Sequence, residues 1–331
     1  MEKYLVSIII PVYNVKPYLK EALDSVIFQT YNNLEILIID DGSTDGSGKI
    51  CDLYLYDSRV KVIHQENRGL SAARNTGLSL MTGSFVAFLD PDDAYYPDYI
   101  STMVAAMDDA DLVISKFSSH CTKGKLKQKG EVIPSIFAGT YDRIYSLHAL
   151  SDNQINVSVW NKLYRVELWK DIRFPEGHNF EDAAIAYEII DRCKKVCVID
   201  DLLYLHRKRS DSITGTLSWK NLDDRLLASS CVEKFIRSKT PEVFSEEQLV
   251  RGKTDHFKQL IRCYGKCFRI KDKVWRREAL RAQILQSDME VDDIRFRAAL
   301  WMIRLFPKLF GIIYLLYLFF RVILTRIKLI R

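Results

Sequence analysis

The amino-acid sequence predicts an α/β fold built on a mostly parallel sheet, with a helical extension at its C-terminal end. Short β-branched segments alternate with segments of helical periodicity through the first hundred residues, which is typical of a parallel sheet covered by helices. From about Trp219 onward the apolar spacing is helical. The chain has 331 residues, 48% of them apolar and 27% charged. This length suits one large domain with an appendage, and the composition is ordinary for a globular protein.

Four predicted strands and three predicted helices account for residues 6 to 89. Residues 6–10 are rich in β-branched side chains and are closed by Pro11, as expected of a buried strand that ends at a loop. The turn after the second strand offers Ser43 and Asp45 as helix N-caps. The other predicted elements are a helix over 17–29, a strand over 34–39, a helix containing Ile50, Leu53 and Tyr54, a strand over 60–63, a helix over 69–80 opened by Ser71, and a strand over 85–89.

Downstream of residue 100 the pattern becomes less regular. A strand is predicted over 111–114, and the charged stretch 123–131 is predicted as a loop or hairpin. Glu181 and Asp182 open a helical pattern, and anionic side chains are favoured at a helix start. A strand over 196–204 leads into the basic run 206–212. We therefore expect an α/β domain over 1–215, a helical extension over 216–294, and a basic, apolar tail over 295–331.

The cysteines and the N-terminal segment predict a reduced, cytoplasmic chain. The seven cysteines are scattered, and the first apolar run is too short for the core of a signal peptide. Two pairs, Cys193/Cys197 and Cys263/Cys267, are spaced to share a helix face. Because zinc sites usually pair cysteines more closely, we expect buried apolar residues rather than metal ligands at these positions.

Acidic and polar side chains follow three of the predicted strands. In a mostly parallel sheet the ligand site lies beyond the carboxyl ends of the strands, so these side chains should converge. Paired carboxylates suit a hard cation such as Mg²⁺ or Mn²⁺, and a carboxylate after the second strand can bind a ribose or an imide. Polar turns that cap the following helices are the alternative interpretation. The stretches are residues 11–14, Asp40 with Asp41, and Asp90 with Asp92.

The same stretches resemble the family 2 glycosyltransferases. Phe88-Leu-Asp-Pro-Asp-Asp93 is similar to the metal motif of that family, with Pro91 where a small residue such as serine is more usual. The resemblance is dense over residues 4 to about 100 and thins to islands as far as about 215. The other matching stretches, in the expected order, are Val6-Ser-Ile-Ile-Ile-Pro-Val-Tyr-Asn14, Asp40-Asp-Gly-Ser-Thr-Asp-Gly-Ser47, Asn67-Arg-Gly-Leu-Ser-Ala-Ala-Arg-Asn75 and Thr82-Gly83.

This resemblance implies a GT-A fold that binds a nucleotide-diphosphate-sugar donor, with a UDP-sugar favoured and Mn²⁺ or Mg²⁺ on the diphosphate. It implies that Pro11, Tyr13 and Asp41 contact the nucleobase and ribose, with Arg74 near the nucleotide. Asp90 is expected to approach the ribose or the sugar, and Asp92 to ligate the metal.

For the acceptor side, the resemblance implies Asp182 as the general base of an inverting transfer. Such a base removes the proton of the attacking hydroxyl and contributes about a hundredfold to ten-thousandfold in rate. Without the resemblance, Asp182 would be interpreted as a helix-start carboxylate. Further residues expected on this side are Trp160, Asn161, Lys162 and Glu181.

His206 is a candidate further metal ligand, because a neutral imidazole suits transition metals. It could equally be a surface-loop histidine. The basic residues that follow it, Arg207 to Arg209, could contact a phosphate or form a solvated face.

The tail predicts a membrane partner. After Asp293 every charged side chain is basic, and residues 309–320 are uninterrupted apolar sequence. This stretch is shorter than the about 20 residues of a spanning helix, and its flanking cations suit anionic phospholipids. We expect peripheral attachment to an anionic membrane surface, the inner face of the plasma membrane. A spanning helix or a helix buried in a protein contact is the alternative, and the tail is too apolar to predict a nucleic-acid partner.

The leading prediction is an inverting glycosyltransferase, hexosyl or N-acetylhexosaminyl, that extends a growing glycan or lipid-linked saccharide in cell-envelope polysaccharide or glycolipid assembly. A nucleotidyltransferase would also place carboxylates and metal beside a nucleotide, but the first strand lacks a glycine-rich basic loop. A dinucleotide-binding oxidoreductase lacks its G-x-G-x-x-G. A catalytically inactive sugar-nucleotide-binding or membrane scaffold protein is disfavoured by four intact carboxylates, Asp41, Asp90, Asp92 and Asp182.

Overall fold

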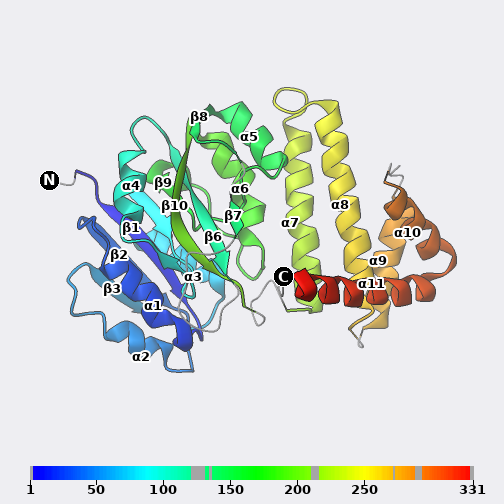
Figure 1. The fold of residues 1–331 in the computed structure, drawn as a ribbon, viewed down its shortest axis with the longest axis horizontal. Helices are drawn as coiled ribbons and strands as arrows, with labels where there is room; N and C mark the ends of the chain where they lie inside the picture. Colours follow the sequence, from blue (N-terminus) through cyan, green and yellow to red (C-terminus); the bar gives the residue numbers. More distant parts are fainter. Residues whose placement is uncertain are drawn as a thin grey trace. The chain divides into compact units, whose positions relative to one another are not determined.

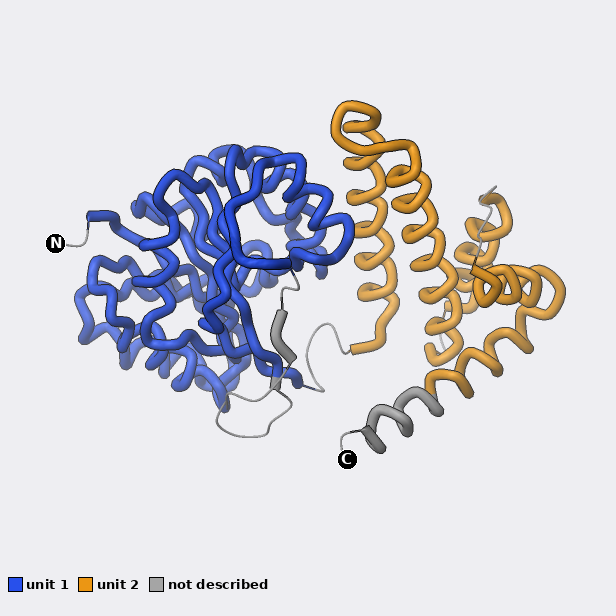
Figure 2. The backbone as a smooth tube through the Cα atoms, turned by 45° about the horizontal axis from the view of Figure 1, so that its top comes forward, with its two compact units in different colours: residues 1–212 blue, residues 213–331 orange. Residues whose placement is uncertain are grey.

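The computed structural model describes residues 3–120, 131–133, 136–209, 216–270, 273–287 and 293–328. The chain divides into two compact units, residues 1–212 and 213–331, which Figure 2 colours separately. In the described part of the chain, the strands belong to the first unit and the second unit is helical. Apart from Glu131, the predicted loop over 123–131 lies outside the described residues, as does the end of the basic run at 210–212.

Unit 1 is built on a mixed, mostly parallel sheet with the strand order β3-β2-β1-β4-β9-β6-β10-β5 (Figure 1). The first four strands pair in parallel, and so do β6 and β10. β9 lies antiparallel between β4 and β6, and β5, β7 and β8 pair antiparallel with their neighbours. The strands are β1 (Val6–Val12), β2 (Leu34–Asp40), β3 (Val60–His64), β4 (Phe85–Phe88), β5 (Ala94–Tyr95), β6 (Leu112–His120), β7 (Glu131–Ile133), β8 (Gly139–Asp142), β9 (Lys162–Arg165) and β10 (Lys195–Arg207).

Helices cover both faces of the central strands, which explains why every residue of β1 and β2 is buried. Ile8 shares a core cluster with Leu23 of α1, whereas Ile9 points to the other face and meets α3 at Gly77. A Cβ at Gly77 would lie 2.5 Å from Cγ2 of Ile9, so α3 approaches the sheet too closely for a side chain there. The helices of this unit are α1 (Lys16–Ile27), α2 (Ser47–Asp52), α3 (Leu70–Leu80), α4 (Tyr99–Ala105), α5 (Arg143–Ser151), the 3-10 helix η1 (Val166–Trp169) and α6 (Glu181–Arg192).

The predicted second helix is shorter than expected. α2 ends at Asp52, so Leu53 and Tyr54 follow it, and Leu53 is 70% exposed. The amides of Leu53 and Tyr54 donate to carbonyls three residues back, which tightens the chain into a turn. Gly46, with φ +93, is the N-cap, and Asp45 accepts the Ser47 amide at 2.9 Å.

Unit 2 consists of helices around a core of its own. Ile303 of α10 and Phe310 of α11 are buried in one cluster with Phe257 and Tyr264 of α8 and Ile284 of α9. The segment expected to be a separate tail thus contributes side chains to the core of this unit. None of the described helices is both long and apolar enough to cross a membrane. The helices are α7 (Trp219–Ser238), α8 (Glu246–Cys267), α9 (Val274–Gln286), α10 (Ile294–Leu305) and α11 (Pro307–Lys328).

Candidate functional site

The carboxyl ends of β1, β2 and β4 lie side by side at one edge of the sheet. In the register of the sheet, Val12 pairs with Asp40, and Ile9 pairs with Phe88. The Asp41 amide continues this pairing by donating to the Val12 carbonyl at 2.8 Å. The polar stretches that follow these three strands are therefore neighbours in space, as predicted from their positions after parallel strands.

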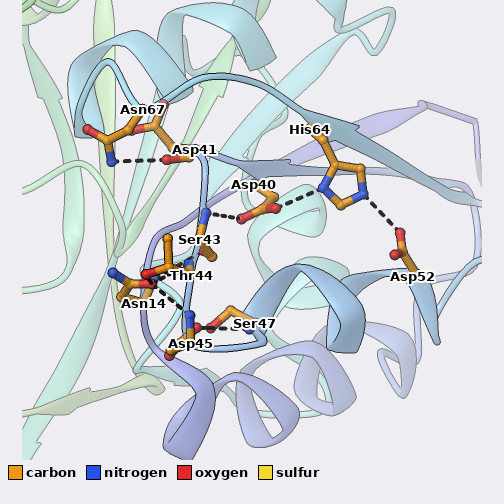
Figure 3. Close-up of polar contacts among 10 residues, drawn as sticks. All are labelled: Asn14, Asp40, Asp41, Ser43, Thr44, Asp45, Ser47, Asp52, His64 and Asn67. Carbon is orange, nitrogen blue, oxygen red and sulfur yellow. Dashed lines mark hydrogen bonds and ion pairs between the residues drawn. The ribbon is translucent and has the colours of Figure 1, made fainter.

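Asn14 ties the loop after β1 to the loop after β2 (Figure 3). Its amide donates to Oγ of Ser43 at 3.2 Å, and its Oδ1 accepts the amides of Thr44 at 2.8 Å and Asp45 at 3.3 Å. Asn14 adopts φ +49, a left-handed conformation that asparagine tolerates better than most residues. The preceding Tyr13 is 49% exposed, so its ring is accessible to a ligand. Pro11, which was also predicted to contact the nucleotide, is buried within β1.

Asp40 and His64 brace the same loop from the side of β3 (Figure 3). Asp40 accepts the Ser43 amide at 3.1 Å and bonds Nδ1 of His64 at 2.8 Å. The other ring nitrogen of His64 lies 2.9 Å from Oδ1 of Asp52. These hydrogen bonds, to Asp40 first and Asp52 second, raise the pKa of His64 above its ordinary value.

Asp41 is buried, and its carboxylate holds the loop that precedes α3. Oδ1 accepts the side-chain amide of Gln65 at 2.6 Å and the main-chain amide of Arg68 at 3.0 Å. Oδ2 accepts the amide of Gly69 at 2.7 Å. Sequence reasoning missed this structural role, and the contact of Asp41 with a nucleobase or ribose stays a prediction beside it.

Arg74 of α3 is the buried centre of the charged cluster. Its Nη2 lies 2.7 Å from Oδ1 of Asp90, just beyond the end of β4, and its Nη1 bonds Oε1 of Glu181 at the start of α6. The guanidinium also lies 5.2 Å from the ring centroid of Phe174. The sequence predicted Arg74 near the nucleotide, but not that it would join the strand edge to α6.

Asp182, the predicted base, follows Glu181 in the first turn of α6. It is partly buried, and its Oδ1 accepts the Ala183 amide at 2.7 Å. Burial raises the pKa of Asp182, while Arg74 acts in the opposite direction. A carboxylate with a raised pKa is a stronger proton acceptor at neutral pH than an exposed one.

The predicted acceptor-side residues Trp160, Asn161 and Lys162 are buried. Asn161 donates through Nδ2 to the carbonyl of Ser115 at 2.7 Å. Lys162 donates to the Asn156 carbonyl at 3.0 Å, and burial lowers its pKa to about 7. Oδ1 of Asn161 accepts a hydrogen bond from Nδ2 of Asn156 at 3.1 Å. In this structure Asn161 and Lys162 therefore support the segment around Asn156, and direct contact with an acceptor stays a prediction.

The predicted metal ligands Asp92 and His206 already have protein partners. Oδ2 of Asp92 lies 2.8 Å from Nε of Arg209, and Nδ1 of His206 lies 2.7 Å from Oγ of Ser119. Burial, and next the negative charge of Asp90, raise the pKa of Asp92 to about 6. Among the described residues, no three His, Cys, Asp or Glu side chains are grouped closely enough to hold a metal ion.

The chemistry of these donors nevertheless fits a divalent cation that a substrate helps to hold. Asp92 offers a carboxylate oxygen and His206 an imidazole nitrogen, both of which Mn²⁺ accepts. Mg²⁺ is commonly bound by one or two carboxylates together with substrate phosphates rather than by a complete protein cage. A nearby cation would also offset the repulsion between Asp92 and Asp90 that contributes to the raised pKa.

Asp93 and Arg207 position the acidic loop, a role that sequence reasoning missed. Asp93 is buried and accepts the Tyr204 hydroxyl and the Arg207 amide, both at 2.7 Å. Nε of Arg207 donates to the main-chain oxygen of Asp92 at 2.9 Å. In the sequence, the sign of this role was Asp93 itself, a third carboxylate in the run from Asp90 to Asp93. Its partners lie on β10, more than a hundred residues away.

Comparisons with known proteins bear on the fold and the family of this chain. Glycosyltransferase GlyG of Streptococcus pneumoniae is 33% identical over 236 residues, which cover 65% of this chain and 75% of GlyG. Glycosyltransferase GlyA of the same organism is 36% identical over 63% of this chain, but the match spans only 31% of GlyA. The crystal structure of Staphylococcus aureus TarS in complex with UDP-GlcNAc superposes with a TM-score of 0.61 at 20% identity, covering 90% of this chain and 91% of that one.

The likeness to TarS confirms the predicted GT-A fold with a helical C-terminal part. The sequence model of Glycosyl transferase family 2 matches residues 7–173, about half of the chain, and this range contains the strand ends and the acidic loop described above. With that match and a relative covered over three quarters of its length, the chain belongs to glycosyl transferase family 2.

Proposed function

We propose that this chain is an inverting glycosyltransferase that moves a hexosyl or N-acetylhexosaminyl group from a nucleotide-diphosphate donor to a hydroxyl group. Membership of the family supports sugar transfer. The complex of TarS with UDP-GlcNAc on the same fold supports a UDP-sugar as the donor. The acceptor we propose is a growing glycan or a lipid-linked saccharide of cell-envelope polysaccharide or glycolipid assembly.

One observation carries this proposal. Arg74 joins Asp90, at the edge where strand-end ligands bind, to Glu181 at the start of α6, and Asp182 is the next residue. A donor held at the strand ends would therefore have a carboxylate with a raised pKa close by. A buried guanidinium thus joins the proposed donor site to Glu181, the residue before the proposed proton acceptor.

In the proposed reaction, Asp182 accepts the proton of the acceptor hydroxyl as its oxygen attacks the anomeric carbon. The bond from that carbon to the diphosphate breaks on the opposite side, so the configuration inverts. Asp92 and His206 would hold Mn²⁺ or Mg²⁺, which when bound would neutralise charge that develops on the departing diphosphate. Arg74 keeps Asp90 and Glu181 in place while the donor and acceptor are converted to products.

The donor assignment is tested by calorimetric titration of the full chain with UDP-, GDP- and TDP-sugars in the presence of Mn²⁺ or Mg²⁺. We expect one nucleotide class, the uridine one, to bind in the micromolar to millimolar range typical of enzyme substrates. The absence of binding by all three classes would contradict the proposal.

The base assignment is tested by Asp182→Asn, which keeps the shape of the side chain but cannot accept the proton. Turnover should fall about a hundredfold to ten-thousandfold, while the donor dissociation constant changes little. Glu188→Gln, on an exposed position of the same helix, is the matched control and should keep normal turnover. Normal turnover in Asp182→Asn would show that another group takes the proton.

A further inference from the structure

Helices α10 and α11 carry an exposed apolar face that the proposed sugar transfer does not use. The spacing of residues 309, 312, 313 and 316 places four of its side chains on one side of α11. At the junction of the two helices, the ring of Trp301 lies 5.7 Å from that of Phe306. We call six of these side chains, each 43% to 57% exposed, the α10–α11 apolar face: Trp301, Leu305, Leu309, Ile312, Ile313 and Leu316.

The opposite side of α11 is fitted closely onto α8. Phe310 is buried, and its ring stacks on Tyr264 at 5.7 Å. A Cβ at Gly311 would lie 2.3 Å from the ring of Phe268, and a Cβ at Gly265 would lie 2.6 Å from the ring of Tyr314. Tyr314 of α11 thus lies against a glycine of α8, and Phe268, the residue after α8, lies against a glycine of α11. This reciprocal packing sets the rotation of α11, so its outer apolar side stays exposed.

α10 is also fixed on its inner side, by a buried side chain and by hydrogen bonds from α9. Ile303 is fully buried in the core of the unit. Nε of Arg281 on α9 donates to the Ile303 carbonyl at 3.1 Å, and Nη2 of Arg281 donates to the Arg304 carbonyl at 3.0 Å. These bonds satisfy carbonyls in the last turn of α10, which have no partner within the helix. The apolar face is therefore part of a packed unit rather than of a loose tail.

The charged residues of α10 and α11 themselves have one sign. Arg297 and Arg304 are exposed on one flank of the α10 side, and Lys308 is exposed at the start of α11. No Asp or Glu occurs after Asp293 in the sequence. Apolar side chains with a tryptophan, bordered by arginine and lysine, are the composition of helices that lie in a membrane interface.

We propose that the α10–α11 apolar face binds an anionic phospholipid surface and lies in its interface without crossing the bilayer. The apolar side chains would enter the boundary of the acyl chains while the cations meet anionic headgroups. A second copy of the chain is a poorer fit, because a two-fold contact through the same face brings the cations of both copies together. This binding does not depend on sugar transfer, so either proposal can fail alone.

The test uses the full chain in a flotation assay with vesicles of phosphatidylcholine, alone or mixed about 3:1 with phosphatidylglycerol. The wild type should bind the mixed vesicles. A quadruple variant, Leu309→Ser, Ile312→Ser, Ile313→Ser and Leu316→Ser, should weaken this binding about a hundredfold or more. Arg304→Glu with Lys308→Glu should weaken it about tenfold or more, and the loss should be confined to the anionic vesicles.

The matched control replaces exposed apolar residues elsewhere in the same unit, Leu227→Ser with Val250→Ser, which are 40% and 53% exposed. This variant should bind like the wild type, and thermal melts should show that all variants remain folded. Point variants are preferred to deletion from residue 295, because deletion would also remove Ile303 and Phe310 from the core.

Three results would overturn the proposal. The first is a wild type that stays with the buffer in the presence of anionic vesicles. The second is a folded quadruple variant that binds them as the wild type does. The third is a wild-type dimer, seen by sedimentation, that becomes a monomer in the quadruple variant while vesicle binding is unchanged. The apolar face would then bind a second copy of the chain.

Discussion

Replacing Arg74 by methionine removes the guanidinium that bonds both Asp90 and Glu181. The substitution keeps most of the length of the side chain but takes away its charge and its donors. Breaking a buried ion pair by deleting one partner typically costs about 3–5 kcal/mol, because the other charge is left without compensation. The size of this effect depends on how far water can screen the abandoned carboxylates.

The exposed fractions of the three side chains show that Arg74→Met breaks a buried ion pair. Arg74 is 3% exposed and Glu181 is 7% exposed, whereas Asp90 is 25% exposed. Most of the loss should therefore come from Glu181, and we expect Arg74→Met to cost about 3–5 kcal/mol at pH 8. At about 2–4 °C per kcal/mol for a domain of this size, the melting temperature should fall by about 6–20 °C.

The loss should shrink in acid. Burial raises the pKa of Glu181 even with Arg74 present, and without Arg74 that pKa should rise further. When a carboxyl group has a higher pKa in the folded state than in the unfolded state, its ionisation opposes folding above the folded pKa. This penalty disappears as the pH falls below the unfolded value. The difference between wild type and Arg74→Met should therefore be smaller at pH 5 than at pH 8.

Urea unfolding of the full chain at both pH values, followed by circular dichroism, measures this difference. Arg68→Met is the control, because Arg68 and its partner Glu176 are 57% and 42% exposed, and the substitution should cost less than about 1 kcal/mol. Adding Glu181→Gln to Arg74→Met should recover part of the loss. A loss below about 1 kcal/mol at pH 8, or an equal loss at both pH values, would refute the electrostatic reasoning.

Three further predictions concern the sheet edge and its loops. His64→Gln should lower the free energy of unfolding by less than about 1 kcal/mol, because half of the side chain is exposed. Since the pKa of His64 is raised in the folded state, this loss should be full at pH 5.5 and vanish as the pH rises through that pKa. Urea titrations at pH 5.5 and 8.5 would measure it. Gly77→Ala should destabilise by about 1–3 kcal/mol in thermal melts despite the better helix propensity of alanine, because its Cβ would lie 2.5 Å from Ile9. Asn14→Ala should cost about 1–3 kcal/mol in urea unfolding and weaken donor binding in calorimetry, because it loses the bonds to Thr44 and Asp45 at a positive φ that alanine disfavours. An unchanged pH dependence, an unchanged melting temperature, or an unchanged dissociation constant would contradict these predictions in turn.

The periodicity of the sequence was sufficient to predict the central strands and the helices α1, α3 and α6 of the first unit, whereas α4 and α5 were not predicted. Strand and helix patterns are local, and the turn after β2 marks where that strand ends. The predicted end of the first strand at Pro11 was wrong, because β1 continues through Pro11 to Val12. The antiparallel insertion of β9 between β4 and β6 was not predicted, because its four residues, Lys-Leu-Tyr-Arg, contain no β-branched side chain and begin and end with a cation. The end of α2 was also missed, because it depends on a tightened turn rather than on composition.

The sequence by itself determined which side chains reach the edge of the sheet, since acidic residues that follow parallel strands must meet there. Only the tertiary structure decided what these side chains do for one another. Arg74 and Glu181 are 107 positions apart, and their ion pair exists because the folded chain brings the start of α6 to Arg74 of α3. Likewise, the glycines that fit α11 onto α8 decide which side of an apolar helix is buried. Composition alone could not show this, because apolar residues occur on both sides of that helix.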